Sequence, residues 1–246
     1  MLKFKGYFDL MEAVHIIICI FAISFGFSIA FAHFSALIDY PLEFLVFFFI
    51  SFVTVGSGFV LHEMGHKLVA LHYGAPARFV MWFQGIALML ITSFFGFLFA
   101  APGAVYIYSQ RITPKQNAII SVVGPLVNVV IALFFLFLSS LYPTKIYLSF
   151  INALIQNPGF GISGGYIEVW RFGAAMNLIL GMFNMIPAFP LDGSKVFSWN
   201  KIAWFVATAI LLILSATIVG FSSVVGWAIM MVLALVFSKL AFGSVK

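Results

Sequence analysis

The chain has 246 residues, of which 64% are hydrophobic and only 8% are charged, and its formal net charge is +5. This composition excludes an ordinary soluble domain and is typical of a protein with several membrane-spanning segments. Its twelve basic residues are spread singly between apolar runs, as topology signals are, and do not form the patch of a nucleic-acid-binding protein. We therefore expect the lipid bilayer as a partner and no nucleic acid.

Six apolar runs are long enough to cross the hydrocarbon core of a bilayer, which takes about 20 helical residues. They lie at about 13–34, 42–71, 117–140, 171–188, 200–219 and 221–240. The first run is too long for a signal-peptide core, so we interpret it as a retained membrane anchor. The sequence thus predicts an all-α polytopic membrane protein with about six transmembrane helices.

A further apolar segment, 79–109, is interrupted by glycines and a proline and ends in a β-rich VYIY. The positive charges indicate whether it crosses, because Lys and Arg are enriched in cytoplasmic loops. If the segment turns back, ten basic residues share one side of the membrane and two lie on the other; if it crosses, the division is six against six. We therefore expect a re-entrant or partly β membrane-embedded segment and two cytoplasmic termini. The predicted cytoplasmic residues are Lys3, Lys5, Lys67, Arg78, Arg111, Lys115, Lys195, Lys201, Lys239 and Lys246.

Two histidines stand four residues apart near the end of the second predicted span, in the sequence HEMGH. On a helix, His62 and His66 share one face, and Glu63 completes an H-E-x-x-H motif. In metalloproteases this motif supplies two zinc ligands and a glutamate that acts as general base. Ionisable residues inside a spanning helix are costly and therefore indicate a functional site. We predict a single catalytic Zn²⁺ at this position.

A catalytic zinc site usually has three protein ligands and one open position, so a third ligand is needed. Of the seven acids, two precede the first span, three lie in external loops and Glu63 is already assigned as the base. This leaves Asp192, which is predicted at about the same depth as the histidines and on the same side of the membrane. Because Pro187 and Pro190 interrupt the preceding helix, we expect Asp192 on irregular backbone. The sequence therefore indicates His62, His66 and Asp192 as the ligands.

Three segments occur in an order that resembles the site-2 protease family, the intramembrane zinc metalloproteases of the peptidase M50 type. They are HEMGH at 62–66, GPLVN at 124–128 and NMIPAFPLDG at 184–193. The chain is similar to minimal members without a PDZ or CBS domain. The resemblance implies one transmembrane protease domain over 1–246, with a catalytic core at about 42–200 and peripheral helices at 13–34, 200–219 and 221–240.

The resemblance also implies roles for individual residues. His62, His66 and Asp192 are implied as zinc ligands and Glu63 as the catalytic glutamate. It further implies that Asn128 lies in the cleft and binds substrate or the developing oxyanion. The residue itself allows another interpretation, because a polar side chain within a span often makes an interhelical hydrogen bond.

We accordingly expect a zinc endopeptidase that cleaves a transmembrane segment of a membrane protein near the cytoplasmic side, in regulated intramembrane proteolysis at the cell membrane. A substrate helix must unwind before it is cut, and the strand edge at 104–108 could receive it by β-addition. Two alternatives stay open. One is a prenyl-protein-processing protease, which would need Glu168 as third ligand, and the other is a non-catalytic metal-binding or transport protein. The sequence names no substrate and specifies no oligomeric state.

Overall fold

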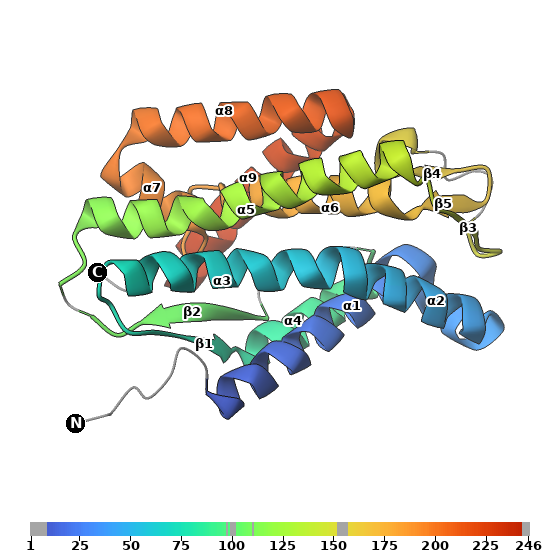
Figure 1. Cartoon of the computed structure of the whole chain (residues 1–246), viewed down its shortest axis with the longest axis horizontal. Helices are drawn as coiled ribbons and strands as arrows, with labels where there is room; N and C mark the ends of the chain where they lie inside the picture. The colour runs from blue at the N-terminus through green and yellow to red at the C-terminus, as the bar shows by residue number, and fades with distance from the viewer. Residues whose placement is uncertain (1–8, 97, 99–101, 110, 152–156, 243–246) are drawn as a thin grey trace.

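A computed structural model of the chain describes residues 9–96, 98, 102–109, 111–151 and 157–242. Lys3, Lys5, Lys246 and both chain termini, which were assigned to the cytoplasmic side, lie outside these residues. The described part is mainly a bundle of long helices, with a short helix and two small sheets at its ends (Figure 1).

Helices occupy all six runs that the hydropathy predicts. They are α1 (Leu10–Asp39), α2 (Pro41–Ser51) continued by the π-helical turn η1 (Phe52–Gly56) and α3 (Ser57–His72), α5 (Pro114–Leu141), α6 (Val169–Asn184), α8 (Lys201–Ile218) and α9 (Phe221–Phe242). Within the residues that the structure describes, four helical segments are long and apolar enough to cross a membrane, and these are Leu10–Asp39, Pro41–His72, Pro114–Leu141 and Lys201–Ile218. The predicted helical membrane protein is therefore confirmed, whereas six spans stay a prediction.

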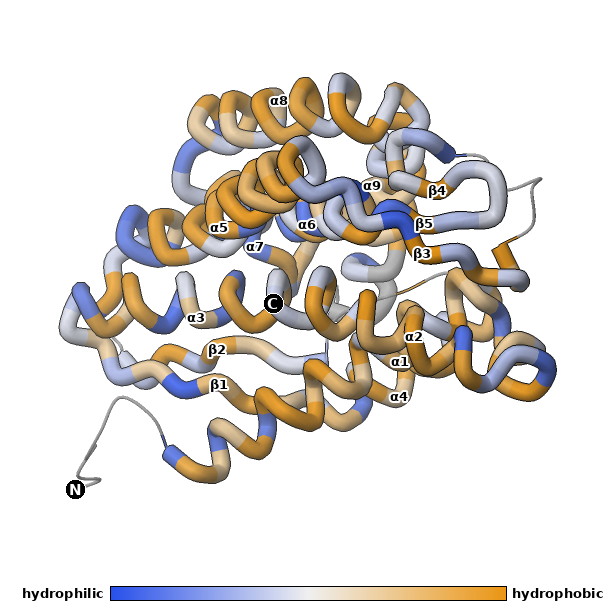
Figure 2. The backbone as a smooth tube through the Cα atoms, turned by 45° about the vertical axis from the view of Figure 1, so that its right-hand side comes forward, coloured by the Kyte–Doolittle hydropathy of each residue, from blue (hydrophilic) through white to orange (hydrophobic). Residues whose placement is uncertain are grey.

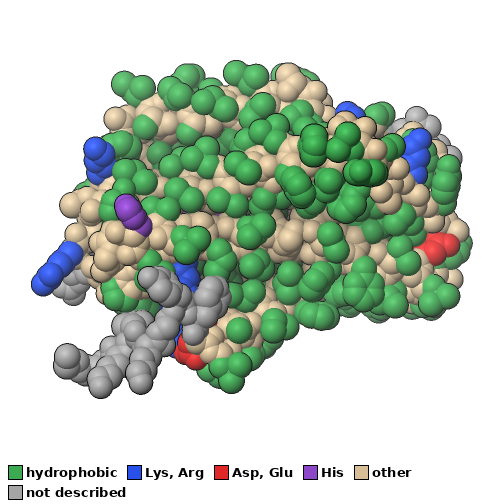
Figure 3. All heavy atoms as spheres, viewed as in Figure 1, with side chains coloured by type: hydrophobic (Ala, Val, Ile, Leu, Met, Phe, Trp, Pro, Cys, Tyr) green, Lys and Arg blue, Asp and Glu red, His purple; other side chains and the backbone are tan. Residues whose placement is uncertain are grey.

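Apolar side chains cover the middle of the molecule and the charged side chains lie toward its ends. Most of the long helices are hydrophobic along much of their length (Figure 2). On the face shown in Figure 3, hydrophobic side chains form a broad belt, and Lys, Arg, Asp and Glu appear at its margins. Exposed leucine, valine, isoleucine and phenylalanine side chains are costly in water but not against lipid, so this surface fits a bilayer.

The segment 79–109 turns back on itself, as the charge count predicted. It contains β1 (Ala77–Met81), α4 (Phe83–Ser93) and β2 (Gly103–Ile107). The two strands pair antiparallel, with Phe79 opposite Val105, so the chain leaves this segment beside the point at which it enters. The segment is partly β, and its sheet lies next to α3 (Figure 1).

The predicted turn-rich connection 142–171 forms a second small sheet at the opposite end of the bundle. Its strands are β3 (Lys145–Tyr147), β4 (Ile162–Ser163) and β5 (Tyr166–Glu168), in the order β3-β5-β4, with the 3-10 turn η2 (Pro158–Phe160) before β4. At the other end, the short helix α7 (Asp192–Trp199) joins α6 to α8. The two ends of the bundle therefore carry different structures, and HEMGH lies toward the end with α7 and β2 (Figure 1).

Glu12 and Lys67 form an ion pair inside the protein. Lys67 Nζ lies 2.7 Å from Oε1 and 2.6 Å from Oε2 of Glu12. The side chain of Glu12 is only 2% exposed and that of Lys67 only 4%. Glu12 Oε1 also accepts a hydrogen bond of 2.9 Å from the backbone N–H of Phe79. This carboxylate thus joins α1 to α3 and to β1, and Lys67, expected at the cytoplasmic boundary, is buried.

Replacing Lys67 with methionine should lower the free energy of unfolding by about 3–5 kcal/mol, because it leaves the Glu12 carboxylate buried without its cation. The double variant Glu12→Gln/Lys67→Met should recover much of that loss, since a glutamine side chain can still accept from the Phe79 N–H. Denaturation in detergent, followed by circular dichroism, measures both changes. If Lys67→Met were as stable as the double variant, this would contradict the claim that an unpaired Glu12 carboxylate causes the loss.

Candidate metal centre

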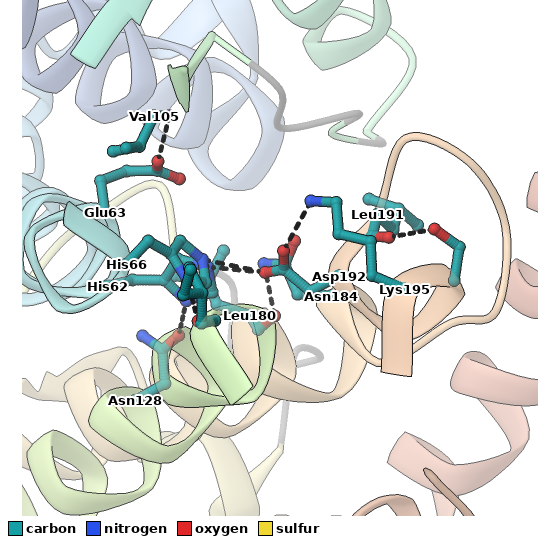
Figure 4. A network of polar contacts seen from close by, with 12 residues as sticks. His62, Glu63, His66, Val105, Asn128, Leu180, Asn184, Leu191, Asp192 and Lys195 are labelled. Carbon is teal, nitrogen blue, oxygen red and sulfur yellow. Dashed lines mark hydrogen bonds and ion pairs between the residues drawn. The ribbon is translucent and has the colours of Figure 1, made fainter. Parts of the chain in front are cut away.

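Three potential ligand atoms from two distant parts of the chain meet at one point. His62 and His66 lie one turn apart on α3, and their Nε2 atoms are 3.0 Å apart. Oδ2 of Asp192, at the start of α7, lies 3.3 Å from Nε2 of His62 and 3.0 Å from Nε2 of His66. All three side chains are at least nine-tenths buried. Figure 4 shows the two imidazoles pointing toward the Asp192 carboxylate.

The tautomers of the two imidazoles indicate what kind of ligand can bind between His62, His66 and Asp192. Nδ1 of His66 lies 2.7 Å from the carbonyl oxygen of Ile120, and Nδ1 of His62 lies 2.6 Å from Oδ1 of Asn128. Both partners are acceptors, so each Nδ1 donates, and a neutral ring then has a lone pair on Nε2. Two lone pairs and a carboxylate oxygen therefore converge with no proton to separate them.

A bound cation would satisfy this arrangement of lone pairs. Three ligand atoms placed 2.0–2.2 Å from one tetrahedral zinc ion are about 3.3–3.6 Å apart. The distances between the two Nε2 atoms and Oδ2 of Asp192 are close to these values. Hydrogen bonds from the second imidazole nitrogen to a carbonyl or amide oxygen are also typical of zinc-ligating histidines. The residues present therefore fit a metal ion of the zinc type, and His62, Glu63 and His66 form a group that could hold one.

Asp192 begins a helix, so the expectation that it lies on irregular backbone was wrong. The irregular part ends at Leu191, and α7 starts with Asp192 itself. Nζ of Lys195 lies 3.1 Å from Oδ1 of this carboxyl group and favours its charged form. Asp192 is therefore ionised, as a metal ligand must be.

Glu168, the alternative third ligand, lies far from the histidines along the bundle. It is the N-cap of α6, where its carboxylate accepts hydrogen bonds from Thr144, Trp170 and Arg171 backbone N–H groups. Asn184 lies at the other end of the same helix and lines the cavity with the histidines. The structure thus brings Asp192 and not Glu168 to the metal centre.

Glu63 lies beside the ligands and contacts the small sheet. Its Oε2 accepts a hydrogen bond of 3.0 Å from the backbone N–H of Val105 in β2. In an antiparallel pair the backbone groups of successive residues point alternately toward and away from the partner strand. Val105 N–H points away from β1, so Gly103, Val105 and Ile107 present a free strand edge toward Glu63.

Asn128 belongs to a buried network that fixes the orientation of His62. Its Oδ1 accepts from His62, and its Nδ2 lies 2.9 Å from Oδ1 of Asn177 and 3.4 Å from the carbonyl oxygen of Gly58. Asn177 in turn donates to the carbonyl oxygen of Thr54 in the π-helical turn η1. These are interhelical hydrogen bonds between α3, α5 and α6, and they favour a positioning role for Asn128.

Gly124 lets α5 approach the two histidines closely. A Cβ atom at this position would lie 2.5 Å from Nε2 of His62 and 2.5 Å from Nε2 of His66, which no real side chain does. The glycine of the GPLVN segment is therefore required by space at the metal centre. The GPLVN motif already contained this glycine, but only the structure shows that a Cβ atom there would clash with the two histidine rings.

A cavity of about 190 Å³ opens beside the ligands. Its walls include Glu63, the β2 residues 103–107, Asn117, Asn184 and the side chain of Lys195. The cavity therefore joins the candidate general base, the free strand edge and the three convergent ligand atoms in one space. Lys195 was not predicted as part of this site, because its proximity depends on how α7 folds against α3, whereas Val105 belongs to the segment 104–108 that was expected to receive the substrate.

Comparison with known proteins agrees with this chemistry. The family described as Peptidase family M50 matches residues 48–233. A Methanocaldococcus jannaschii protein named as a zinc metalloprotease is 38% identical over 198 residues, which cover 80% of this chain and 88% of that protein. A second zinc metalloprotease of that organism is 26% identical over 153 residues, covering 61% of this chain and 34% of its own. A Bacillus subtilis protein, also named as a zinc metalloprotease, is 26% identical over 175 residues, covering 64% and 70%. No solved structure matches the chain.

Proposed function

Because the chain belongs to peptidase family M50 and is a zinc metalloprotease of the membrane, we propose that it is an intramembrane endopeptidase that cleaves a transmembrane segment of another membrane protein. In this proposal His62, His66 and Asp192 hold one Zn²⁺, and Glu63 is the general base. Cleavage takes place near the cytoplasmic side, in regulated intramembrane proteolysis at the cell membrane.

One observation carries the proposal, namely the convergence of two imidazole lone pairs and one carboxylate oxygen within a helical bundle whose buried side chains are mostly apolar. Burying so many polar groups is costly, and a structural role would not require the lone pairs to face one another. The two segments that supply them, α3 and the start of α7, are separated by more than a hundred residues. The helices of the bundle thus support a site for metal-assisted hydrolysis.

The reaction follows from the groups around the cavity. A bound zinc ion would supply a Lewis acid that polarises the scissile carbonyl and lowers the pKa of the attacking water. Glu63 accepts the proton that the water loses and passes it to the nitrogen of the leaving amine. Asn128 and the carbonyl oxygen of Ile120 keep the two imidazoles in the tautomer that leaves Nε2 free.

We further propose that an unwound substrate segment adds to β2 along its free edge, where 104–108 was expected to receive it. Single cysteines placed along 104–108, in a Cys19→Ala background, should form disulfides with cysteines placed near the cleavage point of a model substrate. Cross-links should appear at alternate positions, because alternate side chains of a strand face opposite sides. If no pair of cysteines forms a cross-link in any register, strand addition is contradicted, but the peptidase proposal is not affected.

The peptidase function is tested by purified protein in detergent, supplied with zinc and a model transmembrane substrate. Wild-type protein should cleave the substrate, and a zinc chelator should stop cleavage. Glu63→Gln keeps nearly the same shape but cannot accept the proton, so its turnover should fall by about 10²–10⁴-fold while bound zinc stays near the wild-type amount. Equal turnover by wild type and Glu63→Gln would overturn the assignment.

A further inference from the structure

The carbonyl oxygen of the substrate gains negative charge when water adds to the carbonyl carbon, and a hydrogen-bond donor placed beside the metal would stabilise that charge further. Asn128 has no N–H left for this purpose. Its Nδ2 donates to Asn177 and to the Gly58 carbonyl oxygen, its Oδ1 faces His62, and its side chain is fully buried. The donor must therefore come from another residue on the wall of the cavity.

Among the described residues that line this cavity, Lys195 is the one lysine or arginine. Its Nζ lies 3.1 Å from Oδ1 of Asp192, and its side chain is 36% exposed. An ammonium group has three donors, and Asp192 Oδ1 accepts from one of them. Figure 4 shows this ammonium beside Asp192, across the site from Glu63.

The short helix α7 divides the two oxygens of Asp192 between different partners. Oδ2 faces the two histidines, whereas Oδ1 faces Lys195, three residues further along the helix. Residues three apart lie on the same helical face, so one turn of α7 delivers both a ligand and a cation to the cavity. The position of the ammonium is thereby fixed next to the metal centre before any substrate binds.

We propose that Lys195 is a further catalytic residue, which donates a hydrogen bond from Nζ to the scissile carbonyl oxygen as that oxygen becomes negative. The proposal rests on the peptidase function proposed above. Water oxygen bonds to the carbonyl carbon, the π electrons move to the carbonyl oxygen, and Glu63 takes the water proton. When the carbonyl re-forms, the C–N bond breaks and the leaving nitrogen receives the proton from Glu63, so that one water is consumed and an acid and an amine are formed.

A merely structural Lys195 would act differently, by holding Asp192 in place for the metal. The two roles are separated by measuring bound zinc, kcat and KM for Lys195→Met and Lys195→Arg, with zinc added to saturation. Affinity for a peptide phosphonate, whose charged oxygens imitate the tetrahedral state, gives a readout that does not depend on turnover. Lys115→Met is the matched control, because Lys115 is an exposed lysine at the start of α5 and does not line the cavity.

For Lys195→Met we expect one bound zinc per chain, KM within about threefold of wild type and kcat lower by about 10²–10³-fold. Phosphonate affinity should fall by a similar factor, and Lys195→Arg, which keeps a cationic donor, should recover part of both losses. The proposal is overturned if excess zinc restores kcat in Lys195→Met, or if kcat stays within threefold of wild type. Because wild type and Glu63→Gln are measured in the same assay, a failure of the peptidase function itself would be recognised separately.

Discussion

Replacing Asp192 with alanine is expected to lower zinc affinity by more than about 100-fold, since loss of a residue that only supports a ligand already costs 10–100-fold. Two imidazoles alone leave the ion without its anionic partner and with an extra open position. Competition with a chromophoric chelator measures the affinity, and turnover of a transmembrane substrate should fall with zinc occupancy.

Glu168→Ala is the control for this change, because Glu168 is the other acid considered as a third ligand. It should keep wild-type zinc affinity and lose the N-cap of α6, which costs about 0.5–2 kcal/mol in the free energy of unfolding, together with the hydrogen bonds from Thr144 and Ser139. The opposite result, with zinc lost in Glu168→Ala and kept in Asp192→Ala, would favour the prenyl-protein-processing alternative.

The substitution Gly124→Ala adds a single methyl group and is nevertheless expected to abolish zinc binding. The new Cβ would lie 2.5 Å from the Nε2 atoms of both histidines, so either the rings turn away or α5 moves outward. Overpacking of this kind usually costs about 1–3 kcal/mol, and here the atoms displaced are the ligand atoms themselves. Bound zinc per chain and cleavage of the model substrate measure the effect.

Gly226→Ala in α9 provides the matched helical control, because nothing lies within 4 Å of the Cβ that it would add. It should leave zinc binding and cleavage unchanged, and the better helix propensity of alanine should raise stability slightly. Wild-type zinc affinity in Gly124→Ala would show that the space between α5 and the histidines is larger than the structure indicates.

Local periodicity and charge explain why much of the site could be predicted. The four-residue spacing of His62 and His66 defines a helical face, and the depth argument singled out Asp192 because acids are so rare in this chain. The uneven distribution of Lys and Arg between the two sides predicted that 79–109 turns back, and the antiparallel pairing of β1 with β2 agrees with this. Each of these inferences needs only distances along a helix or the side of a membrane.

The features that escaped prediction depend on contacts between distant segments. The pairing of Glu12 with Lys67 joins residues 55 positions apart, and the hydrogen bond from Val105 to Glu63 spans 42 positions. No periodicity in either segment specifies such a partner. The start of α7 at Asp192 was also missed, because the two prolines before it indicate where one helix ends and not where the next begins.

The buried pair of Glu12 and Lys67 also holds α1 against α3. A lateral gate that parted α1 from α3 would separate two charges away from water, at a cost on the order of 3–5 kcal/mol. It would also withdraw Glu12 from Phe79, and so disturb the sheet that contacts Glu63. By contrast, few residues of α8 are buried, and α8 lies on the far side of α5 and α6 from α1 (Figure 1). Separating α8 from its neighbours would therefore cost less than separating α1 from α3.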